Sequence, residues 1–147
     1  AIALACDIRI AAKSAFCTTG YAKIGLSGDY GISWLLTRTV GPMRARELMF
    51  TSEKVGAERC EQIGLVNRVV DDAKLQDEAF AFARSLAEGP RVALRHMKDN
   101  LDEALHINYS DAHYREAERL VQSSRTADHK EAVASFVEKR KPVFKGR

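Results

Sequence analysis

A carboxylate flanked by glycines is the first feature of this sequence that could do chemistry. Asp29 lies in the stretch SGDYG, between Gly28 and Gly31, and a helix-like run begins near Ile32. The glycines would let the backbone bend sharply enough to aim the carboxylate. At the positive end of a helix the carboxylate would stay ionised, which favours a nucleophile or charge stabiliser over a base.

Asp29 has a simpler interpretation as a helix cap. Asp is common just before a helix because its side chain accepts a hydrogen bond from a free N–H of the first turn. The local sequence leaves both the capping and the catalytic role open. Nearby, Tyr21 and Trp34 could line a pocket with aromatic surface, although ordinary core packing is the alternative, which we favour for Trp34.

Histidine and cysteine form neither a metal-binding nor a disulfide pattern. The histidines show no i,i+4 pairing and the odd number of cysteines shows no CxxC spacing, so we expect no metal site and a reducing compartment. We interpret the histidines as surface or packing residues. They are His96, His106, His113 and His129, and the cysteines are Cys6, Cys17 and Cys60.

Composition excludes several classes of protein. The 147 residues are 46% hydrophobic, which is too apolar for a disordered chain and suits one globular domain or a large piece of one. The net charge of +3 is too small and dispersed for a nucleic-acid binder. No apolar run reaches the roughly 20 residues of a membrane span. We expect a soluble cytoplasmic protein.

The first half predicts an alternation of strands and helices. DIRIAA has the period-2 pattern of a strand with Ile8 and Ile10 inward, and AFCTT is a second candidate strand. Short helices are predicted over 32–40 and from Pro42, the latter with Ala45, Leu48 and Met49 inward. AERCEQIG reads as a helix closed by Gly64, and LVNRVV as the strand that follows.

The second half predicts amphipathic helices only, including helices around 110–122 and 128–141. They have no strands to cover, so they must pack on each other or on another subunit. Their apolar stripes are Leu75, Ala79, Phe82, Ala83 and Leu86; Leu94, Met97, Leu101 and Leu105; Ala117, Leu120 and Val121; and Val133, Phe136 and Val137.

The chain opens with AIALACD, which reads like the middle of an apolar element. It begins with Ala1 rather than Met, and no helix-start signal precedes the run. We therefore expect a fragment that lacks its N-terminal part.

Four stretches together carry a family signature. The four stretches cover essentially the whole chain and follow one another in the order LACDIRIAAKSA, KIGLSGDYGISWLLTRTVG, ARELMFTSEKVGAERCEQIGLVNRVV and EAVASFVEKRKPVFKGR. In order and spacing the chain resembles the crotonase superfamily, the enoyl-CoA hydratase/isomerase family. Agreement of several separate segments is far more specific than a lone motif.

The resemblance implies an α/β fold, more α+β-like in this fragment. Residues 1–72 would be the C-terminal part of the ClpP/crotonase-type β-β-α spiral core. Residues 73–147 would be a helical region for oligomerisation and coenzyme A contact, usually in a trimer or a dimer of trimers.

The resemblance also implies that residues 1–147 lack part of the active site. Family members stabilise an oxyanion of an acyl-CoA thioester with two backbone N–H groups, and both would lie upstream of Ala1. The positions of the two hydratase Glu residues match Ala1 and Tyr21, neither of which is a carboxylate. A phenol with a pKa of about 10 is a poor base at neutral pH, which argues against a simple two-Glu hydration mechanism. Because the oxyanion hole would be missing, we expect the fragment alone to be inactive.

The remaining site residues follow from the same resemblance. Asp29 matches an Asp nucleophile of some members, such as the aryl-CoA dehalogenases. Phe136 and Lys139, expected on one helical face, match residues that contact the adenine and 3′-phosphate region of coenzyme A, often from a neighbouring subunit. Without the family context, the basic cluster around Lys139 would be a solvated tail. The substrate-binding candidates are Tyr21, Gly28, Tyr30, Trp34, Phe136 and Lys139.

The leading hypothesis is therefore an acyl-CoA thioester enzyme, nominally an enoyl-CoA hydratase. Alternatives are an isomerase, hydrolase or dehalogenase that uses Asp29, a non-catalytic acyl-CoA-binding or assembly subunit, and a trimerisation module. No separate cofactor is expected, because coenzyme A is part of the substrate. We expect a homo-oligomer and no nucleic-acid, membrane or metal partner.

Overall fold

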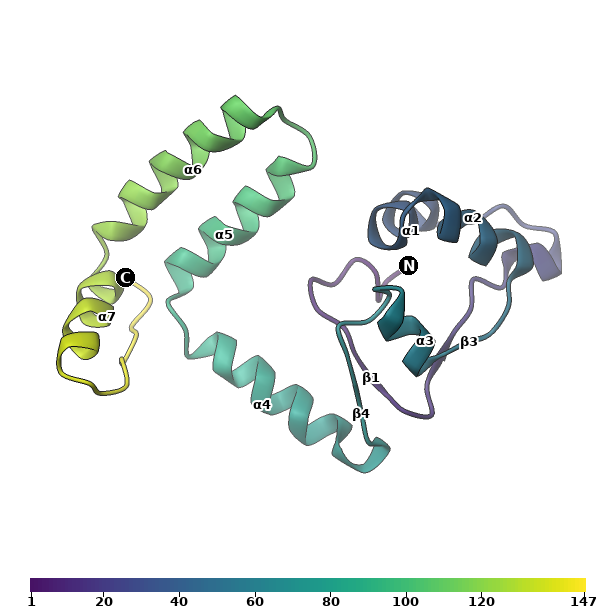
Figure 1. Ribbon diagram of the computed structural model, residues 1–147, viewed down its shortest axis with the longest axis horizontal. Coiled ribbons are helices and arrows are strands. Elements are labelled where there is room, and N and C mark those ends of the chain that lie inside the picture. Colours follow the sequence, from purple (N-terminus) through teal and green to yellow (C-terminus); the bar gives the residue numbers. More distant parts are fainter. The chain divides into compact units, whose positions relative to one another are not determined.

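The computed structural model describes residues 1–147, whose elements fall into two units, Ala1–Phe80 and Ala81–Arg147 (Figure 1). The first unit contains all the strands, and the second contains helices only. The units divide inside helix α4, Leu75–Ala87, whereas the division predicted from the sequence falls before it, after residue 72. None of the helices is both long and apolar enough to cross a membrane.

Two short strand pairs form the β structure of the first unit. Strand β1, Ile10–Ala12, pairs in parallel with β4, Arg68–Val70, in a register that sets Ala11 opposite Val69. Strand β2, Phe16–Cys17, pairs antiparallel with β3, Val55–Gly56. The sequence predicted β1, β2 and β4 but not β3, in which Val55 is followed directly by a glycine.

The strand predicted over residues 7–12 is shorter at its start. The Arg9 N–H donates to a side chain, Asn67 Oδ1 (2.9 Å), rather than to a backbone carbonyl of the neighbouring strand. The Arg9 carbonyl accepts from Asn67 N–H (2.8 Å). Pairing in β1 begins only at Ile10. The prediction that Ile8 faces inward is wrong, since its side chain is exposed.

Three helices build the core of the first unit. Helix α1, Ile32–Val40, and helix α2, Pro42–Thr51, lie side by side, and Gly41 joins them in the sequence. Pro42 occupies the first position of α2, where the backbone N–H that proline lacks would have no partner within the helix. Ala45 and Leu48 are buried and Met49 half-buried, as predicted. The core cluster comprises Leu36, Val40, Ala45, Leu48, Val55, Cys60, Ile63, Leu65 and Val66.

Helix α3, Ala57–Gln62, ends in the glycine motif that the sequence predicted. Gly64 has a φ of 80°, and its N–H donates to Glu61 O (3.0 Å) while Leu65 N–H donates to Cys60 O (2.8 Å). This pair of bonds satisfies the last carbonyls of the helix and turns the chain toward β4. Short 3₁₀ turns lie over Tyr21–Ile24 (η1) and Asp72–Lys74 (η2).

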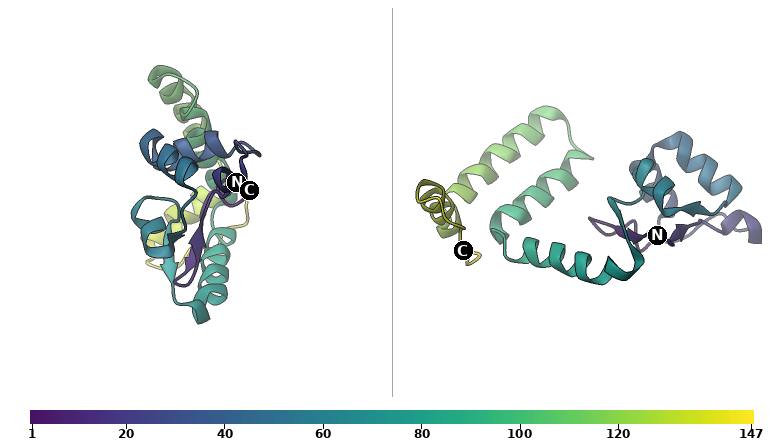
Figure 2. Two further views of the ribbon diagram at one scale, coloured as in Figure 1. Left: turned by 90° about the vertical axis from the view of Figure 1, so that its right-hand side faces the viewer. Right: turned by 60° about the horizontal axis from the view of Figure 1, so that its bottom comes forward.

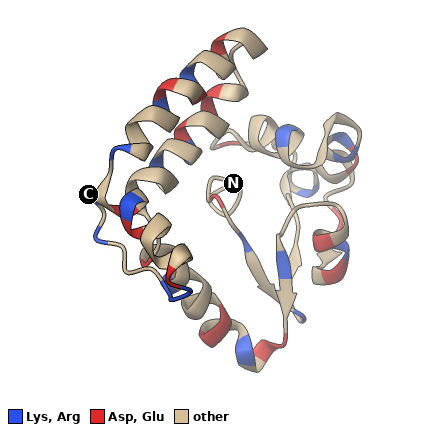
Figure 3. Ribbon diagram, turned by 60° about the vertical axis from the view of Figure 1, so that its left-hand side comes forward, with Lys and Arg blue, Asp and Glu red and all other residues tan.

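The second unit contains helices α5, Arg91–Ala104, α6, Tyr109–Ser124, and α7, Ala127–Val137. The right-hand view of Figure 2 shows α5 and α6 side by side. Arg119 of α6 joins them, because its guanidinium donates to both carboxylate oxygens of Glu103 (2.9 and 2.7 Å) and to Asn100 Oδ1 (2.6 Å). Both signs of charge occur along the helices of each unit (Figure 3).

The apolar stripes of these helices remain exposed within this chain. Leu101, Leu120 and Phe136 are 71%, 70% and 86% exposed, and the prediction that Val133, Phe136 and Val137 face inward is wrong. The buried residues of α7 are instead Asp128 and Ser135. The helix predicted to reach residue 141 ends at Val137, because Lys139 adopts a left-handed φ of 53°.

Candidate functional site

The loop around Asp29 turns sharply because four of its residues have positive φ. These angles are 70° at Gly25, 118° at Gly28, 46° at Tyr30 and 71° at Gly31. Glycine adopts such conformations at little cost, whereas a side chain such as that of Tyr30 does so only where the surrounding structure requires it. Asp29 lies between these turns, on an exposed stretch of chain.

Gly28 is required by space as well as by its backbone angle. A Cβ at this position would lie 2.9 Å from Ile32 Cγ2 and 3.3 Å from Met49 Cε. The loop therefore packs directly on the first turn of α1 and on α2. Any side chain at Gly28 would push the loop away from the helices and move Asp29 with it.

The Asp29 side chain bonds to Tyr21. Its Oδ1 accepts a hydrogen bond from the Tyr21 hydroxyl, which η1 holds eight residues earlier in the chain. Tyr21 is half-buried and Asp29 is exposed. Sequence reasoning proposed both residues singly as site candidates but gave no reason to pair them.

The capping prediction for Asp29 is wrong. The N-cap of α1 is Gly31, which has no side chain to accept a hydrogen bond, and no side chain caps the helix. Asp29 contributes only its backbone carbonyl, which accepts from Ile32 N–H (3.0 Å). The carboxylate is therefore not used to start the helix.

The Tyr21 phenol is held in its protonated form. The hydrogen bond to Asp29 is the main cause that raises the pKa of Tyr21 above its ordinary value of 10.0, with burial second. At neutral pH Tyr21 is a donor rather than a base. The arrangement can therefore fix the position of a carboxylate and support proton transfer at its other oxygen.

Ala1 supplies no chemistry of its own. Its carbonyl accepts the N–H of Ala5 (3.0 Å) in a turn that precedes β1, and its side chain is a methyl group. If the resemblance places a hydratase Glu here, this chain has no carboxylate in its place. Asp29 is then the remaining carboxylate of the candidate site.

Tyr30 and Trp34 present their rings to the surface. Tyr30 is 82% exposed and Trp34 is 47% exposed. The Arg38 guanidinium lies 3.8 Å above the centre of the Trp34 ring, a cation–π contact one turn along α1. The packing prediction for Trp34 is therefore wrong for this chain, and its role toward a substrate stays a prediction.

Phe136 and Lys139 do not share a helical face. Phe136 lies in the last turn of α7, whereas Lys139 follows the end of the helix. Lys139 N–H still donates to Phe136 O (3.3 Å), so the two residues stay close along the backbone. Both side chains are exposed.

An apolar cleft of about 700 Å³ lies in the first unit, within the size range of small-molecule sites. Ile10, Phe16, Ile32 and Leu36 are among its lining residues, but Tyr21, Asp29 and Trp34 are not. Ile32 nevertheless starts the helix that follows the Asp29 loop. The cleft therefore offers an apolar surface next to that loop.

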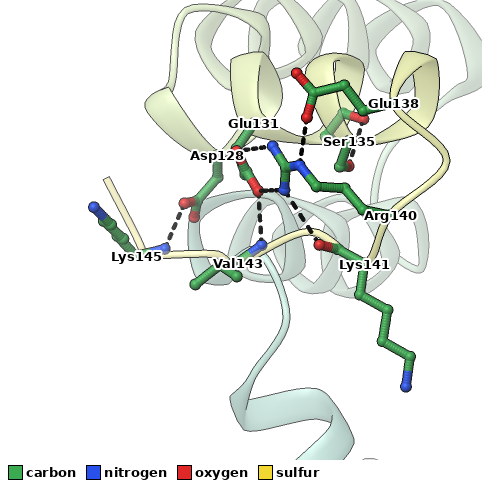
Figure 4. Close-up of polar contacts among 9 residues, drawn as sticks. Asp128, Glu131, Ser135, Glu138, Arg140, Lys141, Val143 and Lys145 are labelled. Carbon is green, nitrogen blue, oxygen red and sulfur yellow. Dashed lines mark hydrogen bonds and ion pairs between the residues drawn. The ribbon is translucent and has the colours of Figure 1, made fainter.

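Several polar residues that organise the chain escaped sequence reasoning. At the C-terminus Glu131 accepts hydrogen bonds from Arg140, and Asp128 accepts from Lys145 N–H (Figure 4). Of Asp128, Glu131 and Arg140, only Arg140 drew attention, as part of the basic cluster. His96 is buried, in line with a packing role, although its Nδ1 has no hydrogen-bond partner. No group of His, Cys, Asp and Glu side chains is arranged to hold a metal ion.

Comparison with known proteins places the whole chain in one family. The model of the enoyl-CoA hydratase/isomerase family matches residues 1–147. The chain belongs to the enoyl-CoA hydratase/isomerase family. The α/β fold expected from the resemblance is confirmed, because crotonase-fold structures superpose on this helix-rich chain with its small sheets.

Among the relatives is the 1,2-epoxyphenylacetyl-CoA isomerase of Escherichia coli, 38% identical over 99% of this chain and 56% of that protein. The short-chain-enoyl-CoA hydratase of Clostridium acetobutylicum is 33% identical over 99% and 56%. A crystal structure of an enoyl-CoA hydratase from Bacillus anthracis superposes with a TM-score of 0.93 at 30% identity, over 98% of this chain and 56% of that one. The chain thus spans about half the length of these relatives.

Proposed function

We propose that the full-length protein is an acyl-CoA thioester enzyme that moves protons on a 2-enoyl-CoA, nominally a hydratase, with Asp29 as its acid–base carboxylate. Membership of the enoyl-CoA hydratase/isomerase family supports the substrate class. The observation that carries the role of Asp29 is its side-chain bond to Tyr21 in place of a helix cap. One carboxylate oxygen is positioned, and the other is left for a substrate.

In the hydration reaction Asp29 would take a proton from water as the water oxygen bonds to C3 of the enoyl group. The C2–C3 double bond becomes a single bond, and C2 receives a proton in return. The Tyr21 hydroxyl would hold the carboxylate in place through both transfers, since its raised pKa keeps it a donor.

Isomerisation is the second candidate, and the presence of a single carboxylate favours it. A double-bond shift needs one base, which removes a proton from C4 and returns a proton to C2, with no water consumed. Ala1 and Tyr21, at the positions that the resemblance matches to the hydratase Glu residues, provide no second carboxylate.

The test is turnover of 2-enoyl-CoA and 3-enoyl-CoA thioesters by the full-length protein, with products analysed by mass spectrometry. Hydration adds the mass of one water to the thioester, whereas isomerisation leaves the mass unchanged and moves the double bond. Asp29→Asn should abolish either reaction. Binding of the thioesters with no turnover of any of them would leave the non-catalytic acyl-CoA-binding subunit.

We also propose a homo-oligomer, a trimer or a dimer of trimers, with coenzyme A as part of the substrate rather than a separate cofactor and with a cytoplasmic location. The exposed Leu101, Leu120 and Phe136 support an assembly that covers them. Light scattering of the full-length protein tests this, and a monomer at micromolar concentration would contradict it.

A further inference from the structure

Ser52 ends helix α2 in a conformation that serine rarely adopts. Its φ of 46° and ψ of 35° lie in the left-handed region that favours glycine. The residue is also fully buried, with 0% of its surface exposed. A strained backbone at a buried position persists only where the contacts around it hold it there. The partners of the Ser52 side chain therefore indicate what this residue does.

The Ser52 hydroxyl belongs to a chain of hydrogen bonds that leads to the 3₁₀ turn η1. Thr19 Oγ1 lies 3.1 Å from Ser52 Oγ and donates its own proton to Leu48 O (2.9 Å). Because a hydroxyl has only one proton, Ser52 is the donor between the two hydroxyls, and Met49 O is a more distant acceptor at 3.5 Å. A lone pair of Ser52 Oγ accepts the N–H of Ala22 (3.2 Å).

Ala22 is the second residue of η1, the turn that begins with Tyr21. The N-cap of η1 is Gly20, which has no side chain to accept an N–H group of the turn. Ser52, 30 residues later in the chain, supplies that acceptor instead. Its carbonyl also accepts from the Thr18 hydroxyl (3.0 Å), so Ser52 holds the chain on both sides of Tyr21. The position of the Tyr21 phenol therefore depends on Ser52.

The end of α2 also supports the loop that carries Asp29. A Cβ at Gly28 would lie 3.3 Å from Met49 Cε, so the loop packs directly on the last turn of the helix. The Tyr21 hydroxyl donates to Asp29 Oδ1 from the other side, where η1 also packs on α2. One helix end thus contacts the chain next to both partners of this hydrogen bond.

We propose that Ser52 is a positioning residue whose hydroxyl fixes η1 so that the Tyr21 phenol meets the Asp29 carboxylate. Ser52 acts through Tyr21 and is not itself a catalytic residue. The proposal rests on the proposed function for the role of Asp29 in turnover. It also explains a serine at a left-handed position, because glycine would relieve the strain but leave the Ala22 N–H without this acceptor.

Ser52→Gly in the full-length protein removes the hydroxyl and leaves the backbone free to keep its left-handed angle. We expect the fold to be retained and kcat to fall about fivefold, within the usual coupling inside one hydrogen-bond network. The KM should stay within about twofold of wild type, because positioning of the acid–base pair acts in the transition state.

Ser52→Ala is the matched control for stability. It removes the same hydroxyl but keeps a Cβ at a left-handed φ, so it should melt at a lower temperature than Ser52→Gly. Positioning by the hydroxyl predicts the same loss of kcat in both variants. A further loss of kcat in Ser52→Ala, in step with its lower melting temperature, would make the role merely structural and overturn the proposal.

Tyr21→Phe tests whether Ser52 acts through the phenol. Once the Tyr21 hydroxyl is absent, adding Ser52→Gly should lower kcat by less than about twofold, because the group that Ser52 positions is gone. A loss of about fivefold in both backgrounds would show that Ser52 acts on another part of the site, and the proposal would be wrong.

The pKa of Tyr21 gives a readout that needs no turnover. The hydrogen bond to Asp29 is the main cause that raises this pKa above 10.0. With isotope-labelled tyrosine, the Tyr21 NMR signal is the one missing from Tyr21→Phe, and its titration should show a lower pKa in Ser52→Gly. An unchanged pKa would overturn the positioning role. If Tyr21→Phe turned over like wild type, the proposed role of the pair in turnover would fail, and this titration would still decide whether Ser52 positions the phenol.

Discussion

The two units of this chain bury opposite kinds of side chain. The buried hydrophobic residues all lie in the first unit, from Ile32 to Val70, whereas the buried residues of the second unit are the polar His96, Asp128 and Ser135. The first unit thus has an apolar core of its own. In the second unit Asp128 and Ser135 have internal hydrogen-bond partners, His96 Nδ1 has none, and the apolar faces of the helices are exposed.

Asp29 of the first unit and Glu131 of the second differ in how many hydrogen bonds their carboxylates accept. Asp29 in the first unit makes one side-chain hydrogen bond, from Tyr21, while Glu131 in the second accepts from Arg140 and from Val143 N–H. A carboxylate saturated with donors stabilises structure and has little capacity left for a substrate. The comparison therefore supports the proposed chemistry at Asp29 in the first unit and a structural role for Glu131 in the second.

Neutralising the Asp29 carboxylate should have the largest effect of the proposed substitutions, a loss of turnover. In the full-length protein we expect Asp29→Asn to lower kcat about a thousandfold, the usual contribution of an acid–base group. The melting temperature should not change, because the side chain caps no helix. Steady-state kinetics and thermal unfolding measure the two quantities.

Asp77→Asn is the control, since Asp77 is an exposed carboxylate in the first turn of α4. Its turnover should match wild type. Unchanged turnover in Asp29→Asn would place the acid–base group outside this chain and would break the assignment of chemistry to the first unit.

The contrast in packing predicts unequal costs for equal truncations. Leu36 is 2% exposed, so Leu36→Ala should lower the free energy of unfolding by about 3 kcal/mol. Leu120 is 70% exposed, so Leu120→Ala should cost little in a monomer. Urea unfolding of both variants of the full-length protein measures the difference. Equal costs would show that α6 is covered in solution, in support of the proposed oligomer.

Removing the Tyr21 hydroxyl should have a smaller effect than removing the charge of Asp29. Tyr21→Phe should lower kcat about tenfold, because a hydrogen bond to a charged group is lost while the carboxylate remains. The raised pKa of Tyr21 predicts that wild-type activity shows no loss from phenol ionisation around neutral pH. A pH–rate profile checks this, and a loss of activity at neutral pH that disappears in Tyr21→Phe would contradict the donor role.

The smallest expected effect is a loss of hydrogen bonding at acid pH between Glu131 and the segment that follows α7, residues 138–147. Hydrogen bonds from Arg140 and Val143 lower the pKa of Glu131 from 4.5 to about 2. A lowered pKa contributes stability that is fully present above pH 4.5 and is lost as the pH falls toward 2. The protection factor of the Val143 amide, which is the intrinsic exchange rate at each pH divided by the measured rate, should therefore fall over this range, and Glu131→Gln should remove that fall. Constant protection down to pH 2 would rule out this role of the Glu131 carboxylate.

Sequence alone predicted the elements whose signals are local. Apolar periodicity indicated α1 and α2, and Gly64 marked the end of α3. Strand β3 was missed because Val55 is its single apolar side chain and a glycine follows directly. The end of α7 was predicted too late because nothing in the sequence shows that Lys139 leaves the helical conformation.

The site was predictable as single residues but not as contacts. The glycines around Asp29 indicated a turn, yet they also supplied the cap position, since Gly31 rather than Asp29 precedes α1. The bond from Tyr21 depends on how η1 folds back toward the loop. Nothing in the sequence indicated that Asp128 and Glu131 hold the C-terminal segment. The backbone N–H groups that they accept from lie up to 18 positions later in the chain.

Trp34 is the single tryptophan of these 147 residues, and it lies on the helix that follows the Asp29 loop with the Arg38 guanidinium over its ring. A cation stacked on indole changes the electronic environment of the ring, and the half-exposed side can meet solvent or a ligand. The chain therefore contains a native fluorophore close to its proposed acid–base group. Changes in its emission during a titration would report ligand binding at the Asp29 loop without any added label.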